Sequence, residues 1–295
     1  MIITHIIGGL GNQLFQYAIA RKISYERNIP LKLDITGFND YKLWQFRLSF
    51  FNIKAEFASK DEICRFKTYS DNKIIKKVYQ KLENIISNSR KDYIKEQFFP
   101  YDPRIEKITD NVYLEGYWQT EKYFKKIASI IRSEITLKEE MRGKNRELKE
   151  KILNDEHSVS LHIRRGDYVT NNLTNKIHGC CSLKYYYKAI KKINDLLISP
   201  NYYVFSDDIP WTRENLKINN PIIYIENEAP EKDCEELILM SLCRHHIIAN
   251  SSFSWWGAWL GTNADKITIT PSRWVNDPSR DMSDIIPDEW IKIND

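Results

Sequence analysis

The feature that most constrains the fold is a regular alternation of strand-like and helix-like segments in the second half of the sequence. Short runs rich in β-branched and aromatic residues alternate with longer helix-like segments, at a spacing typical of β-α-β units. The expected strands cover residues 158–163, 202–205, 221–225, 246–249 and 266–269, and the expected helices 182–198, 211–217, 230–243 and 253–261. This alternation predicts a parallel, doubly wound α/β sheet.

The start of the chain predicts a second unit of the same class. An apolar run at residues 2–7 leads through the turn Gly8-Gly9-Leu10-Gly11-Asn12 into a helix-like segment, the usual beginning of a Rossmann-like sheet. Leu14 stands where the dinucleotide fingerprint has its third glycine, which argues against a hydride-transfer cofactor. Two interpretations of the turn stay open: a helix start capped by Asn12, or a backbone that a ligand can approach closely.

The chain is long enough for two domains with separate cores. Residues 138–151 are charged and poor in apolar side chains, which favours a helical connection between domains. We therefore expect an N-terminal domain at residues 1–137 and a C-terminal domain at residues 138–295.

Composition excludes several classes of function. The 44 Lys and Arg residues and the 40 Asp and Glu residues are interspersed, with a net charge of only +4, so no nucleic-acid partner is expected. Five cysteines without a CxxC pair favour a reduced, cytoplasmic setting. The sequence shows neither a signal peptide nor an apolar run of about 20 residues, so we expect at most a peripheral contact with a membrane.

One stretch bears on such a contact. Residues 59–95 combine lysines with an amphipathic apolar pattern, which predicts helix. Its basic face is expected to be solvated, and docking on the anionic inner face of a membrane is the minority alternative.

Two adjacent arginines follow the expected strand 158–163. Arg164 and Arg165 can share a ligand if the strand ends there, and Gly166 permits the bend. The carboxyl end of a strand in an open α/β sheet is where ligands bind, and planar guanidinium groups bind phosphate oxygens in pairs. The alternatives are a di- or triphosphate site and an ion pair with Asp167.

Two more strand ends carry polar residues. Asp207 and Asp208 could bind Mg²⁺, accept hydrogen bonds from a base or ribose, or cap the next helix. Ser251 and Ser252 open a helix, where they could cap it or help to bind an anion. No D-x-D tripeptide occurs, so no metal is expected, and the arginines must then neutralise a diphosphate.

These residues resemble a known family. The run His162-Ile163-Arg164-Arg165-Gly166-Asp167-Tyr168 resembles the H-x-R-R-x-D motif of GDP-fucose-dependent α-1,2-, α-1,6- and protein O-fucosyltransferases. Three further patches, together with His178-Gly179, are similar to the α-1,2-fucosyltransferases of glycosyltransferase family 11, bacterial type. These three patches cover residues 8–18, 205–208 and 250–260.

The resemblance implies a GT-B-like fold, with two Rossmann-like domains, a cleft between them, an acceptor-side N-terminal domain and a C-terminal domain that binds GDP-fucose. It implies metal-independent, inverting transfer of L-fucose from GDP-fucose to the 2-OH of a terminal galactose, in an oligosaccharide or a lipid-linked glycan of polysaccharide biosynthesis. The implied donor contacts are Asn12 and Gly11 in the glycine turn, Arg164 on the β-phosphate, His162 and Asp207 or Asp208 on guanosine, and Ser251 and Ser252 on the phosphates.

The resemblance leaves the general base open. Related α-1,6 enzymes have a glutamate shortly after the arginine motif, where this chain has Asn171 and Asn172. Asp167, which could also orient the arginines or contact the sugar, and His178 are the candidates. Acceptor specificity is expected within residues 36–120, where Trp44, Tyr117 and Trp118 could form a sugar-binding wall. For Tyr117 and Trp118 taken singly, packing in the core is the favoured alternative.

Two alternative functions remain. One is transfer from another GDP- or UDP-sugar on the same fold, and the other is glycan binding without catalysis.

Overall fold

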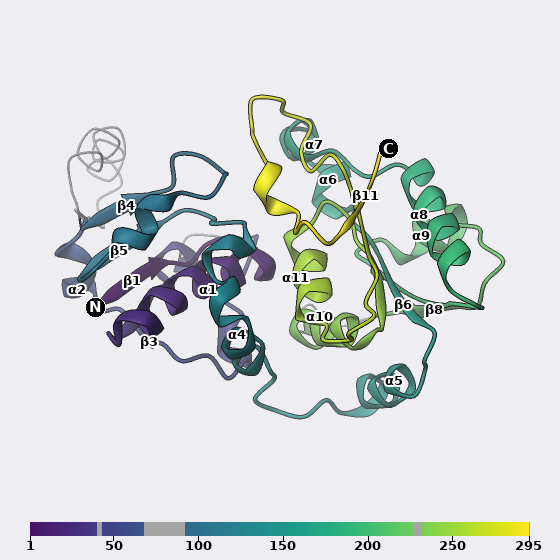
Figure 1. Cartoon of the computed structure of the whole chain (residues 1–295), viewed down its shortest axis with the longest axis horizontal. Coiled ribbons are helices and arrows are strands. Elements are labelled where there is room, and N and C mark those ends of the chain that lie inside the picture. Colours follow the sequence, from purple (N-terminus) through teal and green to yellow (C-terminus); the bar gives the residue numbers. More distant parts are fainter. Residues whose placement is uncertain (40–42, 68–91, 227–231, 295) are drawn as a thin grey trace. The chain divides into compact units, whose positions relative to one another are not determined.

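The computed structural model of the protein describes residues 1–39, 43–67, 92–226 and 232–294 (Figure 1). This part of the chain forms two compact units, Met1–Ile135 and Thr136–Asp295. Helix α5 (Gly143–Leu153) lies near the start of the second unit and overlaps the charged stretch 138–151, where composition favours a helical connection.

The first unit is built on a parallel five-stranded sheet in the order β3-β2-β1-β5-β4. Its strands are β1 (Ile2–His5), β2 (Leu31–Asp34), β3 (Glu56–Phe57), β4 (Tyr93–Lys95) and β5 (Val112–Glu115). Strand β1 lies in the middle, with Ile2 opposite Leu31 on one side and Val112 on the other. Ile2 is fully buried, as expected of a strand between two parallel neighbours.

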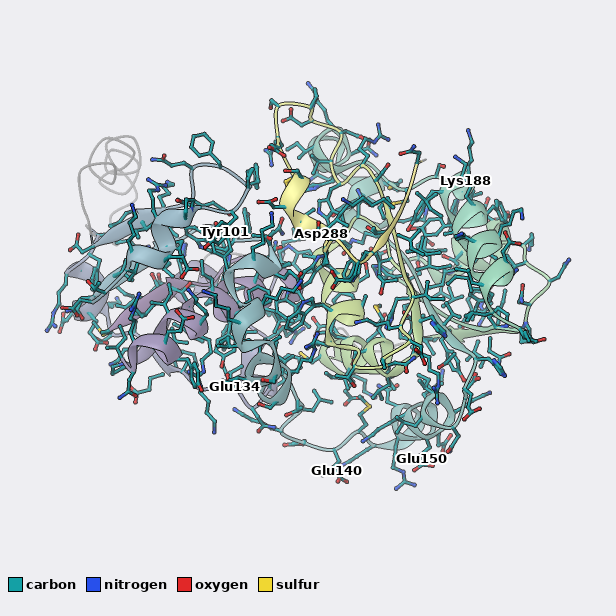
Figure 2. All side chains as sticks on the ribbon, in the orientation of Figure 1. Tyr101, Glu134, Glu140, Glu150, Lys188 and Asp288 are labelled. Atoms are coloured by element: carbon teal, nitrogen blue, oxygen red, sulfur yellow. The ribbon has the colours of Figure 1, made fainter. Side chains whose placement is uncertain are left out.

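Helix α1 (Leu10–Arg27) is anchored by a buried polar cluster. Arg21 Nη2 lies 2.7 Å from Oε1 of Glu134 in α4 (Ala128–Glu134), and the Tyr17 hydroxyl donates to the same carboxylate. Glu134 is labelled in Figure 2. Burial, followed by the bond to Glu134, raises the pKa of Tyr17, so the phenol stays protonated and keeps this hydrogen bond. The cluster ties the end of the first unit to its first helix.

One expectation for the first unit was wrong in part. The stretch 59–95 was expected to be helical, but among its described residues only α2 (Lys60–Cys64) is a helix. Strand β4 pairs in parallel with β5, and Tyr93 stacks on Tyr113 at 5.4 Å. Residues 68–91, which carry most of the lysines of this pattern, lie outside the described residues. Residues 121–134 form the 3₁₀ turns η4 (Glu121–Tyr123) and η5 (Lys125–Ile127), followed by α4.

The second unit contains a parallel six-stranded sheet in the order β11-β10-β9-β6-β7-β8. Its strands are β6 (Ser158–Ile163), β7 (Asn201–Ser206), β8 (Ile222–Ile225), β9 (His245–Ile247), β10 (Thr268–Pro271) and β11 (Ile291–Ile293). From β6 the chain first adds strands on one side and then, from β9, on the other. The junction of β6 and β9 is therefore the topological switch point, where open α/β sheets bind ligands.

Helices cover both faces of this sheet. Tyr202 and Val204 pack with α8 (Leu183–Leu196) on one face, whereas Tyr203 and Phe205 pack with α5 and α10 (Asp233–Leu242) on the other. This confirms the predicted doubly wound α/β fold, because alternate residues of one strand serve two cores. The remaining helical segments are η1 (Thr36–Asn39), η2 (Leu48–Phe50), η3 (Pro103–Lys107), α6 (Gly166–Thr170), α7 (Asn172–His178), α9 (Ile209–Asn215), α11 (Ser252–Leu260) and η7 (Ser283–Ile285).

Among the described helices, none combines the length and the apolar character needed to cross a membrane.

Candidate functional site

The two arginines after β6 pair with the two aspartates after β7. Arg164 Nη1 lies 2.9 Å from Asp207 Oδ2, and Arg165 Nε lies 3.2 Å from Asp208 Oδ2. These pairs form because Ile163 of β6 is opposite Ser206 of β7 in the parallel register. An ion pair therefore exists, but its partners are these aspartates. The side chain of Asp167 lies outside what the structure describes, so its expected roles stay predictions.

The local chain explains how this cluster is held. Asp208 is the N-cap of α9 and accepts the Trp211 N–H at 3.2 Å, so the capping interpretation is correct for this aspartate. Asp207 accepts the Arg165 N–H at 2.8 Å. A Cβ on Gly166 would lie 2.4 Å from Asp207 Oδ2, so any side chain there would displace the carboxylate.

The two arginines are similarly exposed, at 18% and 20%, but they differ in their contacts. Arg165 lies 3.5 Å from the centroid of the Trp211 ring as well as against Asp208, which fits a largely structural role. Arg164 lies 5.4 Å from the Tyr168 ring, and its side chain is 18% exposed. A guanidinium has five N–H donors, so pairing with Asp207 does not by itself prevent Arg164 from also binding a phosphate oxygen.

His162 lies next to this cluster, one residue before the end of β6. Its ring is almost fully buried, 5.7 Å from the ring of Phe253, and Nδ1 has no hydrogen-bond partner among the described residues. Burial, followed by the charge of Arg164, lowers the pKa of His162 to about 3. The imidazole is therefore neutral at pH 7, when it can accept one hydrogen bond and donate another.

We expect His162→Gln to flatten the dependence of stability on pH. The unfolded chain binds this proton below pH 6.5 but the folded protein only near pH 3, so stability falls as the pH falls between these values. Removing the group should reduce that slope by roughly 1 kcal/mol per pH unit. The free energy of unfolding in urea, measured at pH 4.5, 5.5 and 6.5 for wild type and variant, gives this slope. His157→Gln, at an exposed position, is the control, and equal slopes in wild type and His162→Gln would contradict the expectation.

The serine segment opens α11, which follows β9. Ser251 occupies the N-cap position, but its hydroxyl makes no capping hydrogen bond within the described chain. Its carbonyl accepts the Trp255 N–H at 2.9 Å, which fixes the first turn. Helix capping therefore does not account for the presence of a hydroxyl group at Ser251. Ser251 and Ser252 follow β9, the neighbour of β6 at the switch point, so both lie at the carboxyl edge where ligand binding is expected.

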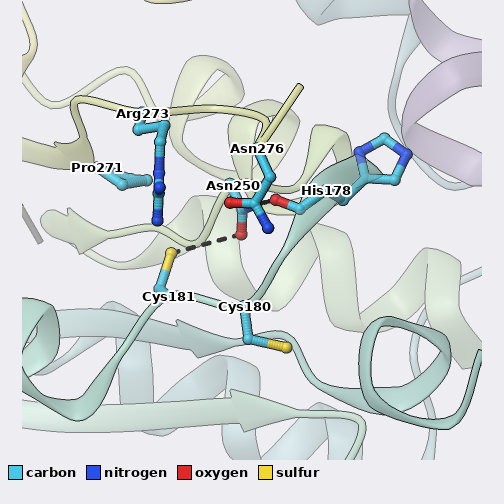
Figure 3. A pocket seen from close by; sticks show the side chains of 7 residues that line it. All are labelled: His178, Cys180, Cys181, Asn250, Pro271, Arg273 and Asn276. Atoms are coloured by element: carbon cyan, nitrogen blue, oxygen red, sulfur yellow. Dashed lines mark hydrogen bonds between the residues drawn. The ribbon is translucent and has the colours of Figure 1, made fainter. Parts of the chain in front are cut away.

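Asn250 connects this helix start to three other segments. Its Nδ2 donates to the carbonyl oxygens of His178 at 3.0 Å, Gly179 at 3.1 Å and Trp274 at 3.1 Å. Its Oδ1 accepts the Cys181 S–H at 3.4 Å (Figure 3). One buried amide thus fixes the position of the loops around Ser251.

His178 is placed by the same contacts. In Figure 3 its backbone carbonyl faces Asn250, while its imidazole points away from Cys181 and Arg273. The ring stacks on Tyr168 at 5.2 Å, and the Tyr168 hydroxyl donates to the Asn250 carbonyl at 3.3 Å. A small cavity forms beside it, lined by His178, Cys180, Cys181, Asn250, Pro271, Arg273 and Asn276.

The glycine turn belongs to the first unit. Gly8 has φ +79°, and a Cβ there would lie 2.8 Å from Asn12 Nδ2, so the turn requires glycine. Gly9 is the N-cap of α1, so the interpretation of Asn12 as the cap was wrong. Instead, Asn12 Oδ1 accepts a hydrogen bond from Gln119 Nε2 at 2.7 Å. The Trp44 ring covers the start of the helix, because a Cβ built on Gly9 would lie 3.5 Å from it.

Other predicted residues of the first unit divide into buried and exposed positions. Gly11 is buried in the first turn of α1. Trp118 is fully buried and packs edge-on against Tyr123 at 5.7 Å, so its interpretation as a wall residue was wrong. Tyr117 is 38% exposed and remains available to a ligand.

Two residues with prominent contacts were not singled out from the sequence. Asn250 directly precedes Ser251 and Ser252, and its position at the end of an expected strand could have identified it as a candidate site residue. Glu96 accepts two backbone N–H groups at the end of β4, but no alternation marks that strand in the sequence.

Two Rossmann-like parallel α/β units in one chain define the protein as GT-B-like in fold, the architecture of a large class of glycosyltransferases. NodZ α-1,6-fucosyltransferase, in a crystal soaked with GDP-fucose, superposes with a TM-score of 0.53 at 15% identity, over 88% of this chain and 91% of that one. At this identity the likeness concerns the fold alone.

Sequence comparison gives the family. The model of glycosyl transferase family 11 matches residues 1–294. An α-1,2-colitosyltransferase of Escherichia coli is 38% identical over 99% of both chains, and the O-antigen biosynthesis glycosyltransferase WbnK of the same organism is 34% identical over 97% of this chain and 98% of its own. The chain belongs to glycosyltransferase family 11, as its motifs indicate, and is a glycosyltransferase.

Proposed function

We propose that the protein transfers L-fucose from GDP-fucose to the 2-OH of a terminal galactose, with inversion at the anomeric carbon. The observation that carries the proposal is Arg164, partly exposed at the switch point of the second sheet and held by Asp207. The four motif patches that resemble α-1,2-fucosyltransferases support the choice of sugar and linkage.

The chemistry follows from the charges of the site. The bond between the fucose anomeric carbon and the β-phosphate oxygen breaks, and negative charge develops on the departing GDP. The guanidinium of Arg164 stabilises this charge, and the first-turn N–H groups of α11 add to the stabilisation. Neutral His162 and one of Asp207 and Asp208 contact guanosine, and the Ser251 and Ser252 hydroxyls contact the phosphates.

The protein alone supplies the positive charge in this proposal, without a metal ion. Incubation with GDP-fucose and lactose, with and without EDTA, tests it by product analysis. We expect lactose carrying α-1,2-linked fucose at unchanged rate in EDTA. The absence of both transfer and donor hydrolysis would contradict the function, and abolition by EDTA would contradict metal independence.

A colitose donor is the second candidate, because an α-1,2-colitosyltransferase is 38% identical over 99% of this chain. Colitose is L-fucose without its 3-hydroxyl group. A site that hydrogen-bonds this hydroxyl discriminates strongly against the deoxy sugar, whereas a site that does not contact it accepts both. Comparing kcat/KM for the GDP derivatives of the two sugars decides between the donors.

The remaining alternatives are tested by binding. Thermal shift with GDP-fucose, GDP-mannose and UDP-galactose identifies the preferred nucleotide and sugar. Tight binding of GDP and glycan with zero turnover would favour a non-catalytic glycan-binding protein. As natural acceptor we propose a galactose-terminated lipid-linked glycan, met at the inner membrane face by peripheral contact, since one relative is named for O-antigen biosynthesis.

A further inference from the structure

The guanidinium of Arg164 is contacted from two directions within the second unit. Its Nη1 lies 2.9 Å from Asp207 Oδ2, and its Cζ lies over the Tyr168 ring, 5.4 Å from the ring centre. A cation within about 6 Å of the centre of an aromatic ring is attracted to the ring face. The carboxylate and the ring together therefore restrict the orientations that this guanidinium can take.

The position of Tyr168 follows from the short helix α6. The Arg165 carbonyl accepts the Val169 N–H at 2.9 Å, so the helical turn starts directly after β6. Residues four apart lie on the same side of such a turn, which brings Tyr168 to the side of Arg164. Nδ2 of Asn175 in α7 donates to the Tyr168 carbonyl at 2.6 Å, and this bond ties the turn to the next helix.

The Tyr168 ring is itself fixed by two other segments. The His178 imidazole stacks on it at 5.2 Å with 11° between the ring planes. The Tyr168 hydroxyl donates to the Asn250 carbonyl at 3.3 Å. The Asn250 amide in turn donates to the His178 carbonyl at 3.0 Å, so both partners of the ring are bonded to each other (Figure 3). The ring is thus held in one orientation from the end of α7 and from the segment after β9.

Arg165 has a similar pair of contacts with a different origin. Its carboxylate partner Asp208 caps α9, and its aromatic partner Trp211 lies in the first turn of the same helix. The ring at Arg165 therefore connects β6 only to α9. The ring at Arg164 connects β6 to the segment after β9, on the other side of the switch point.

This connection joins the two segments that contact the donor in the proposed function. Arg164 follows β6, and Ser251 directly follows Asn250 after β9. Electrostatic stabilisation of a transition state is strongest when the stabilising groups are oriented before the charge develops. A rigid ring between the two segments fixes the guanidinium relative to the start of α11, and so supplies such orientation.

We propose that Tyr168 is a positioning residue for the transfer reaction, whose ring orients the guanidinium of Arg164 toward the β-phosphate of the donor. This inference rests on the proposed function. When the bond between the anomeric carbon and the β-phosphate oxygen breaks, the electron pair stays on GDP, and the oriented guanidinium meets that charge. Tyr168 contacts neither the donor nor the acceptor in this step and acts through Arg164.

Tyr168→Leu removes the ring and keeps an apolar side chain. It should lower kcat for transfer to lactose by about 10-fold, since displacing a catalytic group by about 1 Å can cost up to about 100-fold. KM for GDP-fucose should change less than about threefold, because the loss lies mainly in the transition state. Tyr168→Phe keeps the ring and should recover most of the rate. If it were as slow as Tyr168→Leu, the ring would not orient Arg164, and the inference would be wrong.

Tyr224→Leu is the matched control. The Tyr224 ring, which is also half-buried, lies 4.1 Å from Cζ of Arg213, and Arg213 pairs with Glu226 at 2.6 Å. The same combination of ring, guanidinium and carboxylate thus occurs at the edge strand β8, away from the switch point. Tyr224→Leu should leave kcat unchanged, whereas a loss equal to that of Tyr168→Leu would contradict a specific role for Tyr168.

A double-mutant cycle separates positioning from support of the fold. If Tyr168 acts through Arg164, adding Tyr168→Leu to Arg164→Ala should lower the remaining rate less than about twofold, because contacting residues that act together are not additive. A loss of about 10-fold in both backgrounds would overturn the inference, since independent effects add. Circular dichroism gives the folded fraction of each variant, by which the rates are corrected.

The same measurements distinguish failure of this inference from failure of the proposed function. A wild type that transfers the sugar beside an equally active Tyr168→Leu variant would overturn this inference alone. A wild type that transfers no sugar from any GDP-sugar would overturn the proposed function and this inference together.

Discussion

Arg164→Ala is expected to lower the rate of transfer from GDP-fucose by about 100-fold or more, as removal of one donor to a developing anion does elsewhere. The guanidinium lies at the carboxyl end of β6 and pairs with Asp207 at 2.9 Å, so its position is fixed before the donor binds. Without it, the Asp207 carboxylate also loses its counter-ion beside the departing phosphate. Initial rates at saturating GDP-fucose measure the loss.

Arg213 is a matched control for this substitution. Like Arg164, it pairs with a carboxylate, Glu226 at 2.6 Å, and lies over a tyrosine ring, Tyr224 at 4.1 Å. It lies within α9 rather than at the end of a strand, so Arg213→Ala should change the rate less than about twofold. Arg164→Lys keeps the charge but not the planar fork and should fall in between. Near-normal activity of Arg164→Ala would remove this residue from its proposed role.

The parallel sheet of the second unit was predictable because the alternation of strand-like and helix-like segments repeats several times in the sequence. Strands β6, β7, β9 and β10 are buried along most of their length, and each of the strands β6 to β10 is followed or preceded by a helix-like segment long enough to cover it. Strands β3, β4 and β11 were not predicted, since two or three residues show no periodicity and pair only because a neighbour is already in place. Tertiary pairing in this way overrides local propensity.

The candidate site was predictable in its residue types but not in its contacts. Arg164, Asp207 and Ser251 each follow a strand, so their approach to one edge follows from the parallel fold. Which carboxylate meets which arginine depends on the register that places Ile163 opposite Ser206, and the sequence carries no record of register. For the same reason Glu96, which follows a strand without a pattern, could not be anticipated.

Trp255→Ala is expected to destabilise the second unit by about 4 kcal/mol, within the range for loss of a large aromatic side chain from a core. The Trp255 ring is fully buried, and its Nε1 donates to the Ile285 carbonyl at 2.6 Å. It also packs against three further tryptophans, Trp256, Trp259 and Trp290. The substitution therefore leaves a large cavity and an unpaired carbonyl. Urea unfolding followed by circular dichroism measures the loss.

The consequence for function follows from where Trp255 lies. It is in the first turn of α11, so the same packing that stabilises the core also holds the start of the helix and the Ser251 and Ser252 hydroxyls in place. Trp255→Phe, which keeps most of the ring volume but loses the bond to Ile285, should cost about 1–2 kcal/mol and retain GDP binding. If Trp255→Ala instead unfolds at the wild-type urea concentration, the tryptophan cluster does not hold this helix, and the serines must be positioned by Asn250 alone.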